Sequence, residues 1–174
     1  AGEAFDKVAR ALGLSYPGGP AIDKLARSGN PYAIEFPRAK VDGHEYGFSF
    51  SGLKSAVLNY LNGCEMKNIE VNVADVAASF QQAVIDVVVN KATDAAIKSG
   101  GNRIAIAGGV AANSALRAAL EEECNKNGIS LYCPSPVYCT DNAAMIAVQG
   151  YYNFMAGKRS GLDLNAVPNL KLGI

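Results

Sequence analysis

The feature that most constrains the fold is an alternation of helix and strand patterns in the second half of the chain. Apolar residues at helical spacing, ended by Gly100-Gly101, predict one long helix over residues 73–99. Two short apolar segments beyond it predict buried strands, and a helical pattern follows each of them. In chain order, these elements are expected at 103–107, 112–126, 129–133 and 140–156. This is the order of an α/β protein, in which helices connect neighbouring strands.

The first half of the chain predicts helices and a hairpin instead. Apolar residues at helical spacing over 4–12, and a proline suited to a first turn at position 20, predict two short helices on either side of Pro17-Gly18-Gly19-Pro20. Asp42-Gly43 is a hairpin turn sequence, and large apolar residues alternate over 46–50. We therefore expect a helical and hairpin section over 1–72 and an α/β section over 73–174.

The charge balance limits the partners that this chain can bind by itself. Sixteen basic and sixteen acidic residues give a net charge of zero. A polyanion binder gains much of its affinity from a basic excess, so any RNA contact must come from a local patch or from partners. The sequence shows neither a signal-peptide order at its start nor an apolar run of membrane-spanning length. A cytoplasmic location without membrane contact is expected.

Cysteine and histidine usage argues against both a disulfide framework and a self-contained zinc site. The cysteines lack the tight paired spacing of metal ligands, and His44 is the one histidine. The four cysteines are Cys64, Cys124, Cys133 and Cys139. We expect them to be reduced thiols.

A glycine pair that follows the first predicted strand indicates a phosphate-binding turn. Gly108 and Gly109 end the strand and open a helix, so bare backbone N–H groups and the positive end of the helix dipole face a ligand together. Asn113 can then hydrogen-bond a ribose or a base edge. The alternative is an ordinary strand-to-helix turn in which Asn113 is a capping or surface residue.

Aspartates mark two further candidate segments. Asp6 and Asp23 can accept hydrogen bonds from ribose hydroxyls, and Gly19 lets the backbone lie against a sugar or base. The alternative is that each aspartate pairs with an arginine four residues on, as Asp23 would with Arg27. Asp141 begins the last predicted helix, either as its N-cap or as a rigid metal ligand.

Lys54 lies in the first turn of a predicted helix, where a cation is poorly matched to the helix dipole. This mismatch makes Lys54 a candidate for an anion or RNA contact.

These motifs occur in one order that resembles a known family. Gly2-Glu-Ala-Phe-Asp-Lys, Pro17-Gly-Gly-Pro, Phe48-Ser-Phe-Ser-Gly-Leu-Lys, Gly108-Gly-Val-Ala-Ala-Asn and Cys139-Thr-Asp-Asn-Ala-Ala-Met-Ile-Ala together resemble the tRNA N6-adenosine threonylcarbamoyltransferases, bacterial branch, once described as O-sialoglycoprotein endopeptidases. The resemblance covers essentially the whole chain. It implies the two-lobed actin/Hsp70/sugar-kinase (ASKHA) fold, with residues 73–174 in its C-terminal lobe and 1–72 beside its nucleotide cleft.

The resemblance also implies chemistry and partners. The family transfers threonylcarbamoyl from threonylcarbamoyl-adenylate to N6 of the adenosine 3′ of the tRNA anticodon. Motif positions assign Asp6, Gly19, Asp23 and Asn113 to adenylate binding, and Asp141 to one divalent metal ion, iron or zinc. The bacterial enzymes act with a paralogous partner and an ATPase.

Two family motifs of the N-terminal lobe are missing from the 174 residues. These are a His-x-x-x-His metal pair and a Ser-Gly-Gly-His-Thr phosphate loop. We therefore expect a C-terminal fragment that is inactive alone. An unpaired sheet edge in such a fragment predicts a homodimer through the cut surface.

Two alternatives from the residues stay open at this point: a fragment of a sugar-kinase-like, ATP-dependent phosphotransferase, and a non-catalytic interaction module. A protease is excluded on motif grounds, because the sequence has neither a Ser-His-Asp set nor a His-Glu-x-x-His helix.

Overall fold

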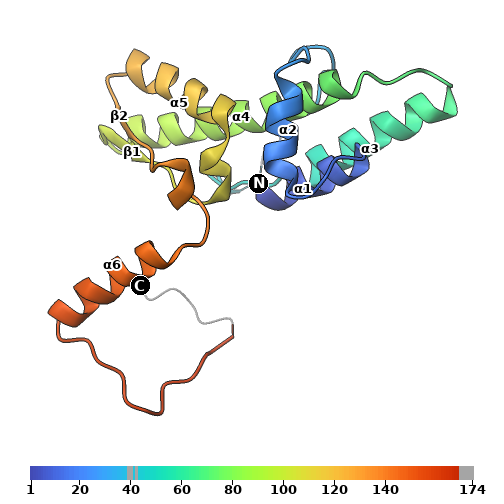
Figure 1. Ribbon diagram of the computed structural model, residues 1–174. Helices are drawn as coiled ribbons and strands as arrows, with labels where there is room; N and C mark the ends of the chain where they lie inside the picture. Colours follow the sequence, from blue (N-terminus) through green and yellow to red (C-terminus); the bar gives the residue numbers. More distant parts are fainter. Residues whose placement is uncertain (39–40, 42, 169–174) are drawn as a thin grey trace. The chain divides into compact units, whose positions relative to one another are not determined.

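The computed structural model describes residues 1–38, 41 and 43–168 (Figure 1). The chain divides into two compact units, 1–140 and 141–174.

The described part of the first unit is mainly helical and holds one small sheet. Its helices are α1 (Gly2–Ala11), α2 (Gly18–Ala26), α3 (Ser51–Met66), α4 (Val73–Lys98) and α5 (Ser114–Lys126). Its strands are β1 (Arg103–Ala105) and β2 (Ser130–Tyr132), and its 3-10 turns are η1 (Gly109–Ala112) and η2 (Pro136–Tyr138). The strands pair in parallel with Ile104 opposite Leu131, so the predicted α/β class is confirmed.

Helix α4 is the element against which the rest of the first unit packs. Its N-terminal half lies against α1, α2 and α3, and the Phe80 ring meets the Phe5 ring edge-on at 5.1 Å between centroids. Its C-terminal half lies beside α5 and β1 (Figure 1). The core thus joins residues from both sides of the division expected at residue 72, which stays a prediction about the longer two-lobed protein.

A buried serine fixes the loop that follows α2. The Ser79 hydroxyl on α4 donates to the Asn30 carbonyl (3.2 Å) and accepts from the Ile34 N–H (3.1 Å). Asp75, one turn earlier, accepts from the Asn30 N–H at 2.7 Å. The loop is not part of a helix or strand, and hydrogen bonds to α4 satisfy its backbone groups instead.

The expected hairpin is wrong wherever it can be checked. Asp42 lies outside the described residues, and none of residues 43–50 forms a strand. The segment is bound to α4 instead: the Lys91 ammonium donates to the Gly47 carbonyl and lies 5.3 Å from the centre of the Phe48 ring. The Tyr46 hydroxyl donates to Asp94 at 3.2 Å. These contacts fix the segment to α4 in place of a partner strand.

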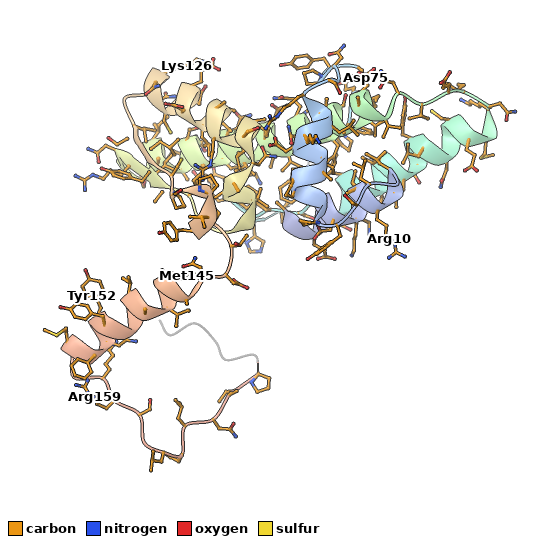
Figure 2. All side chains as sticks on the ribbon, in the orientation of Figure 1. Arg10, Asp75, Lys126, Met145, Tyr152 and Arg159 are labelled. Carbon is orange, nitrogen blue, oxygen red and sulfur yellow. The ribbon has the colours of Figure 1, made fainter. Side chains whose placement is uncertain are left out.

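In its described residues, 141–168, the second unit contains one helix, α6 (Ala143–Met155). Its sequence is rich in large apolar residues, yet none of the α6 side chains is buried. Figure 2 shows Met145 and Tyr152 projecting from this helix. Across the described part of the chain, no helix combines the length and the apolar character that crossing a membrane requires.

Candidate functional site

Asp6 joins the two N-terminal helices. Its Oδ1 accepts the backbone N–H of Gly18, the first residue of α2, at 2.9 Å. A helix begins with N–H groups that lack partners inside the helix, and a carboxylate from a neighbouring helix satisfies one of them here. The expected pairing of Asp6 with Arg10 is not among the ion pairs of the described residues. The second oxygen of Asp6 accepts no hydrogen bond from them.

Gly18 and Gly19 differ sharply in the space around them. A Cβ added to Gly18 would lie 2.6 Å from the Asp6 Cα and 2.7 Å from the Ala9 Cβ, whereas one added to Gly19 would meet no atom within 4 Å. Gly18 therefore allows α1 and α2 to touch. Gly19 is open, as a backbone that lies against a ligand requires.

The predicted phosphate-binding turn forms a short 3-10 helix between β1 and α5. Gly108 has φ of +86°, a conformation that residues with a Cβ rarely adopt. A Cβ added at Gly108 or Gly109 would meet no atom within 4 Å, so both glycines face open space. Val110 packs against the core that contains α1. The turn thus presents exposed backbone while its next residue holds it to the first unit.

Asn113 is the N-cap of α5, which confirms the capping alternative. Its Oδ1 accepts the N–H of Leu116 at 2.8 Å, and its Nδ2 donates to Oε1 of Gln81 on α4 at 2.7 Å. Asn113 and Gln81 are both buried. A ribose contact by Asn113 stays a prediction.

Asp23 binds the same end of α5 from α2. Its carboxylate accepts from the Ser114 hydroxyl at 2.8 and 3.0 Å and from the Ser114 N–H at 3.3 Å. The expected pairing with Arg27 is also present, at 3.5 Å. Sequence reasoning missed Ser114 and Gln81, since nothing local marks a serine or glutamine that meets an aspartate or asparagine from another helix.

Arg117 connects η1 with the loop that precedes the second unit. Its Nε donates to the Ala111 carbonyl at 2.5 Å, and its NH2 group donates to the Pro134 carbonyl at 2.6 Å. The same NH2 group lies 3.2 Å from the buried Cys139 sulfur. One half-buried guanidinium thus fixes the turn at the candidate site relative to residues 134–139.

Lys54 lies near the acidic residue Glu3. The neighbouring Glu3 forms an ion pair with Lys7, whose hydrogen bond is the main cause that lowers the pKa of Glu3, and the charge of Lys54 lowers that pKa further. An RNA contact by Lys54 stays a prediction.

Asp141 is exposed and is not the N-cap of α6, so the capping interpretation is wrong. Asn142 takes that position, and its Oδ1 accepts the Met145 N–H at 2.9 Å. Among the described residues no group of three His, Cys, Asp or Glu side chains is placed to hold a metal ion. Asp141 alone does not fit a complete metal site.

The candidates of the first unit lie at the starts of α2 and α5. Asp6 contacts the start of α2, Asp23 of α2 contacts the start of α5, and the Gly108-Gly109 turn leads directly into Asn113. Depressions of about 610 Å³ and 780 Å³ in this unit lie elsewhere, along residues 31–38 and between α5 and β2. The second oxygen of Asp6 and the open backbone at Gly19 and Gly108-Gly109 match the hydroxyls and phosphate of a nucleotide.

Comparison with known proteins gives consistent matches. The family model described as "TsaD: tRNA N6-adenosine threonylcarbamoyltransferase" matches residues 1–148. Proteins named tRNA N6-adenosine threonylcarbamoyltransferase from Clostridium botulinum (strain 657) and Clostridium beijerinckii are 59% and 60% identical over 173 residues. The protein of that name from Clostridioides difficile (strain 630) is 59% identical over 171 residues.

These matches cover 98–99% of this chain and 51% of each relative, so the chain spans about half the length of the curated relatives it matches. The family model covers far more than half of the chain, including every candidate residue named above. The chain therefore belongs to the tRNA N6-adenosine threonylcarbamoyltransferase family.

Proposed function

We propose that this chain supplies the C-terminal half of a transferase that moves threonylcarbamoyl from threonylcarbamoyl-adenylate to N6 of the adenosine 3′ of the tRNA anticodon. The observation that carries the proposal is that Asp6 and Asp23 bind the starts of α2 and α5, where Gly19 and the Gly108-Gly109 turn leave backbone open. Family membership supports it. The names of the relatives give the sugar-kinase alternative no support.

The reaction is an acyl transfer. A bond forms between N6 and the carbamoyl carbonyl carbon, the bond from that carbon to the phosphate oxygen breaks, AMP leaves, and N6 gives up a proton. In our proposal Asp6 accepts a ribose hydroxyl through its second oxygen, while the backbone at Gly19 and at Gly108-Gly109 lies against the sugar and phosphate. Asp23 and Asn113 hold the start of α5, which follows the Gly108-Gly109 turn.

The finer parts of the proposal concern the longer protein. Residues 73–174 would belong to the C-terminal lobe of an ASKHA fold, and 1–72 would border its nucleotide cleft. Asp141 would contribute one ligand to a divalent metal ion, iron or zinc, whose other ligands would come from the N-terminal half of the longer protein. A paralogous partner, an ATPase and a cytoplasmic location are part of the same proposal.

The test is transfer of labelled threonine to unmodified tRNA, with the adenylate-forming enzyme and the partner proteins supplied. The chain alone is compared with the same chain joined to the N-terminal half of the Clostridium botulinum relative. We expect transfer by the joined protein only. Transfer by the chain alone would contradict the half-site proposal, and transfer by neither would contradict the assigned reaction.

Substitution at Asp6 refines this test. In the joined protein, Asp6→Asn keeps an oxygen for the Gly18 N–H but turns the other carboxylate oxygen into a donor. We expect transfer to fall at least about tenfold, the loss associated with one charged hydrogen bond. Glu122→Gln, an exposed residue of α5 paired with Lys126, is the control and should keep full activity.

A further inference from the structure

Gln81 is a buried polar residue that no sequence motif singled out. It lies on α4 next to Phe80, whose ring packs on Phe5 of α1, and 5% of its surface is exposed. Buried polar groups in folded proteins are normally hydrogen-bonded. Ser79 and Thr93, also buried on α4, follow this rule through bonds to backbone carbonyls.

The orientation of the Gln81 amide follows from a chain of two hydrogen bonds that begins at the backbone N–H of Leu116 and passes through Asn113. The Leu116 N–H can only donate, so the Asn113 atom beside it must be the oxygen, at 2.8 Å. Asn113 therefore presents its NH2 group to Gln81, at 2.7 Å. The Gln81 atom that accepts this hydrogen bond must be its oxygen, Oε1. The NH2 group of Gln81 therefore points away from Asn113.

That NH2 group makes no hydrogen bond to the described residues. In the described part of the chain, however, no fully buried side-chain nitrogen or oxygen lacks a partner. Nε2 of Gln81 therefore reaches the surface although most of its side chain does not. The Gln81 amide is fixed through its oxygen, and its NH2 group is suited to donate to a ligand atom that accepts hydrogen bonds.

We propose that Gln81 belongs to the nucleotide-binding set: its Oε1 holds the Asn113 amide, and its Nε2 donates to an acceptor atom of the bound adenylate. The acceptor is a ring nitrogen of the base or an oxygen of the ribose or phosphate. This inference rests on the proposed function, because it takes the ligand to be an adenylate.

Two substitutions at Gln81 separate its two roles. Glu at this position still accepts from Asn113 but replaces the NH2 donor with an oxygen, whereas Met removes both groups at similar length. Gln82→Met is the matched control, because Gln82 is the next residue of α4 and its NH2 group donates to Asp86 at 2.7 Å, away from Asn113. All three changes are made in the joined protein.

AMP binding is measured by calorimetry, and the Asn113 side-chain NH2 resonances are followed by NMR without ligand. We expect Gln81→Glu to weaken AMP binding at least about tenfold with unchanged Asn113 resonances. Gln81→Met should weaken binding and also shift those resonances, and Gln82→Met should do neither.

The outcomes distinguish this inference from the proposed function. Binding of AMP by Gln81→Glu with unchanged affinity, or Asn113 resonances undisturbed in Gln81→Met, overturns the role of Gln81 alone. Failure of the unsubstituted joined protein to bind AMP overturns the proposed adenylate site, and the donor role of Gln81 with it.

Discussion

Asp6, Asp23 and Asn113 each satisfy one of the first N–H groups of a helix, and the same residues contact or support the proposed nucleotide site. Carboxylates and amides are favourable at helix N-termini because those N–H groups lack partners and carry partial positive charge. Substitution at these positions therefore changes stability and binding together. A useful experiment at the residue scale must separate the two effects.

The neighbouring glycines of α2 allow that separation. Gly18→Ala places a Cβ 2.6 Å from the Asp6 Cα, so α1 and α2 must move apart, at a cost of about 1–3 kcal/mol in the free energy of unfolding. Gly19→Ala meets no atom within 4 Å and should not lower stability. Urea unfolding checks both values. In the joined protein, Gly19→Ala should nevertheless weaken AMP binding, and equal stability loss in the two variants would contradict this account.

The N-cap role of Asn113 was open to prediction from the sequence, whereas its partner was not. An asparagine after a glycine pair and before a helical pattern is a local signal for a cap. Gln81 lies 32 positions away and Ser114 lies 91 positions from Asp23, so their contacts depend on how α2, α4 and α5 pack. At Asp141 the local signal was misleading, because the next residue, Asn142, is also a favourable cap and is the N-cap of α6 in the structure.

At the element scale, Arg117 fixes the loop at 134–139. Methionine at this position keeps the apolar stem of the side chain but leaves the Ala111 and Pro134 carbonyls without their donor. We expect Arg117→Met to lower the free energy of unfolding by about 2–3 kcal/mol. Hydrogen exchange should become faster in residues 134–139, and unchanged exchange there would exclude the proposed role.

Charged residues of α4 bind the segment 44–50, among them Asp94, which accepts from the Tyr46 hydroxyl. A hydrogen bond from Lys98, with one from Tyr46, lowers the pKa of Asp94 below its ordinary value of 3.8. A carboxyl with a lowered pKa contributes stability that is fully present above its ordinary value and is lost as pH falls through the folded value. The difference in urea midpoint between the chain and Asp94→Asn should therefore be constant above about pH 4 and shrink below it. A difference that grows on acidification would contradict the assignment.

The hairpin prediction failed here for a physical reason. Asp42-Gly43 and the alternation over 46–50 are local sequence signals for a hairpin, and they take no account of contacts with a distant helix such as α4. Tyr46 finds its partner 48 positions along the chain, on α4, and Lys91 occupies the Gly47 carbonyl. The helices and both strands, whose patterns extend over longer or more apolar segments, were predicted with small end-point errors. The expected burial of the strands is wrong, because only the central residue of each, Ile104 and Leu131, is even partly buried.

The large apolar side chains of α6 are exposed, because in the described part of the second unit no other element packs against them. Ile146 and Tyr152 are 66% and 64% exposed, and exposed apolar patches of this kind promote association. We expect the chain alone to associate with itself at micromolar concentrations, which native mass spectrometry and sedimentation can detect. Ile146→Glu should reduce the association. A monomer at every concentration would contradict this prediction and the homodimer expected from the sequence.

Helix α4 contributes residues to all three apolar clusters of the first unit, from Val76 and Phe80 to Val89 and Ala96. Neither end of that unit can open without exposing part of the same helix, so residues 1–140 should melt in a single cooperative transition. A bound nucleotide would then raise the melting temperature of the entire unit, including helices that never touch it.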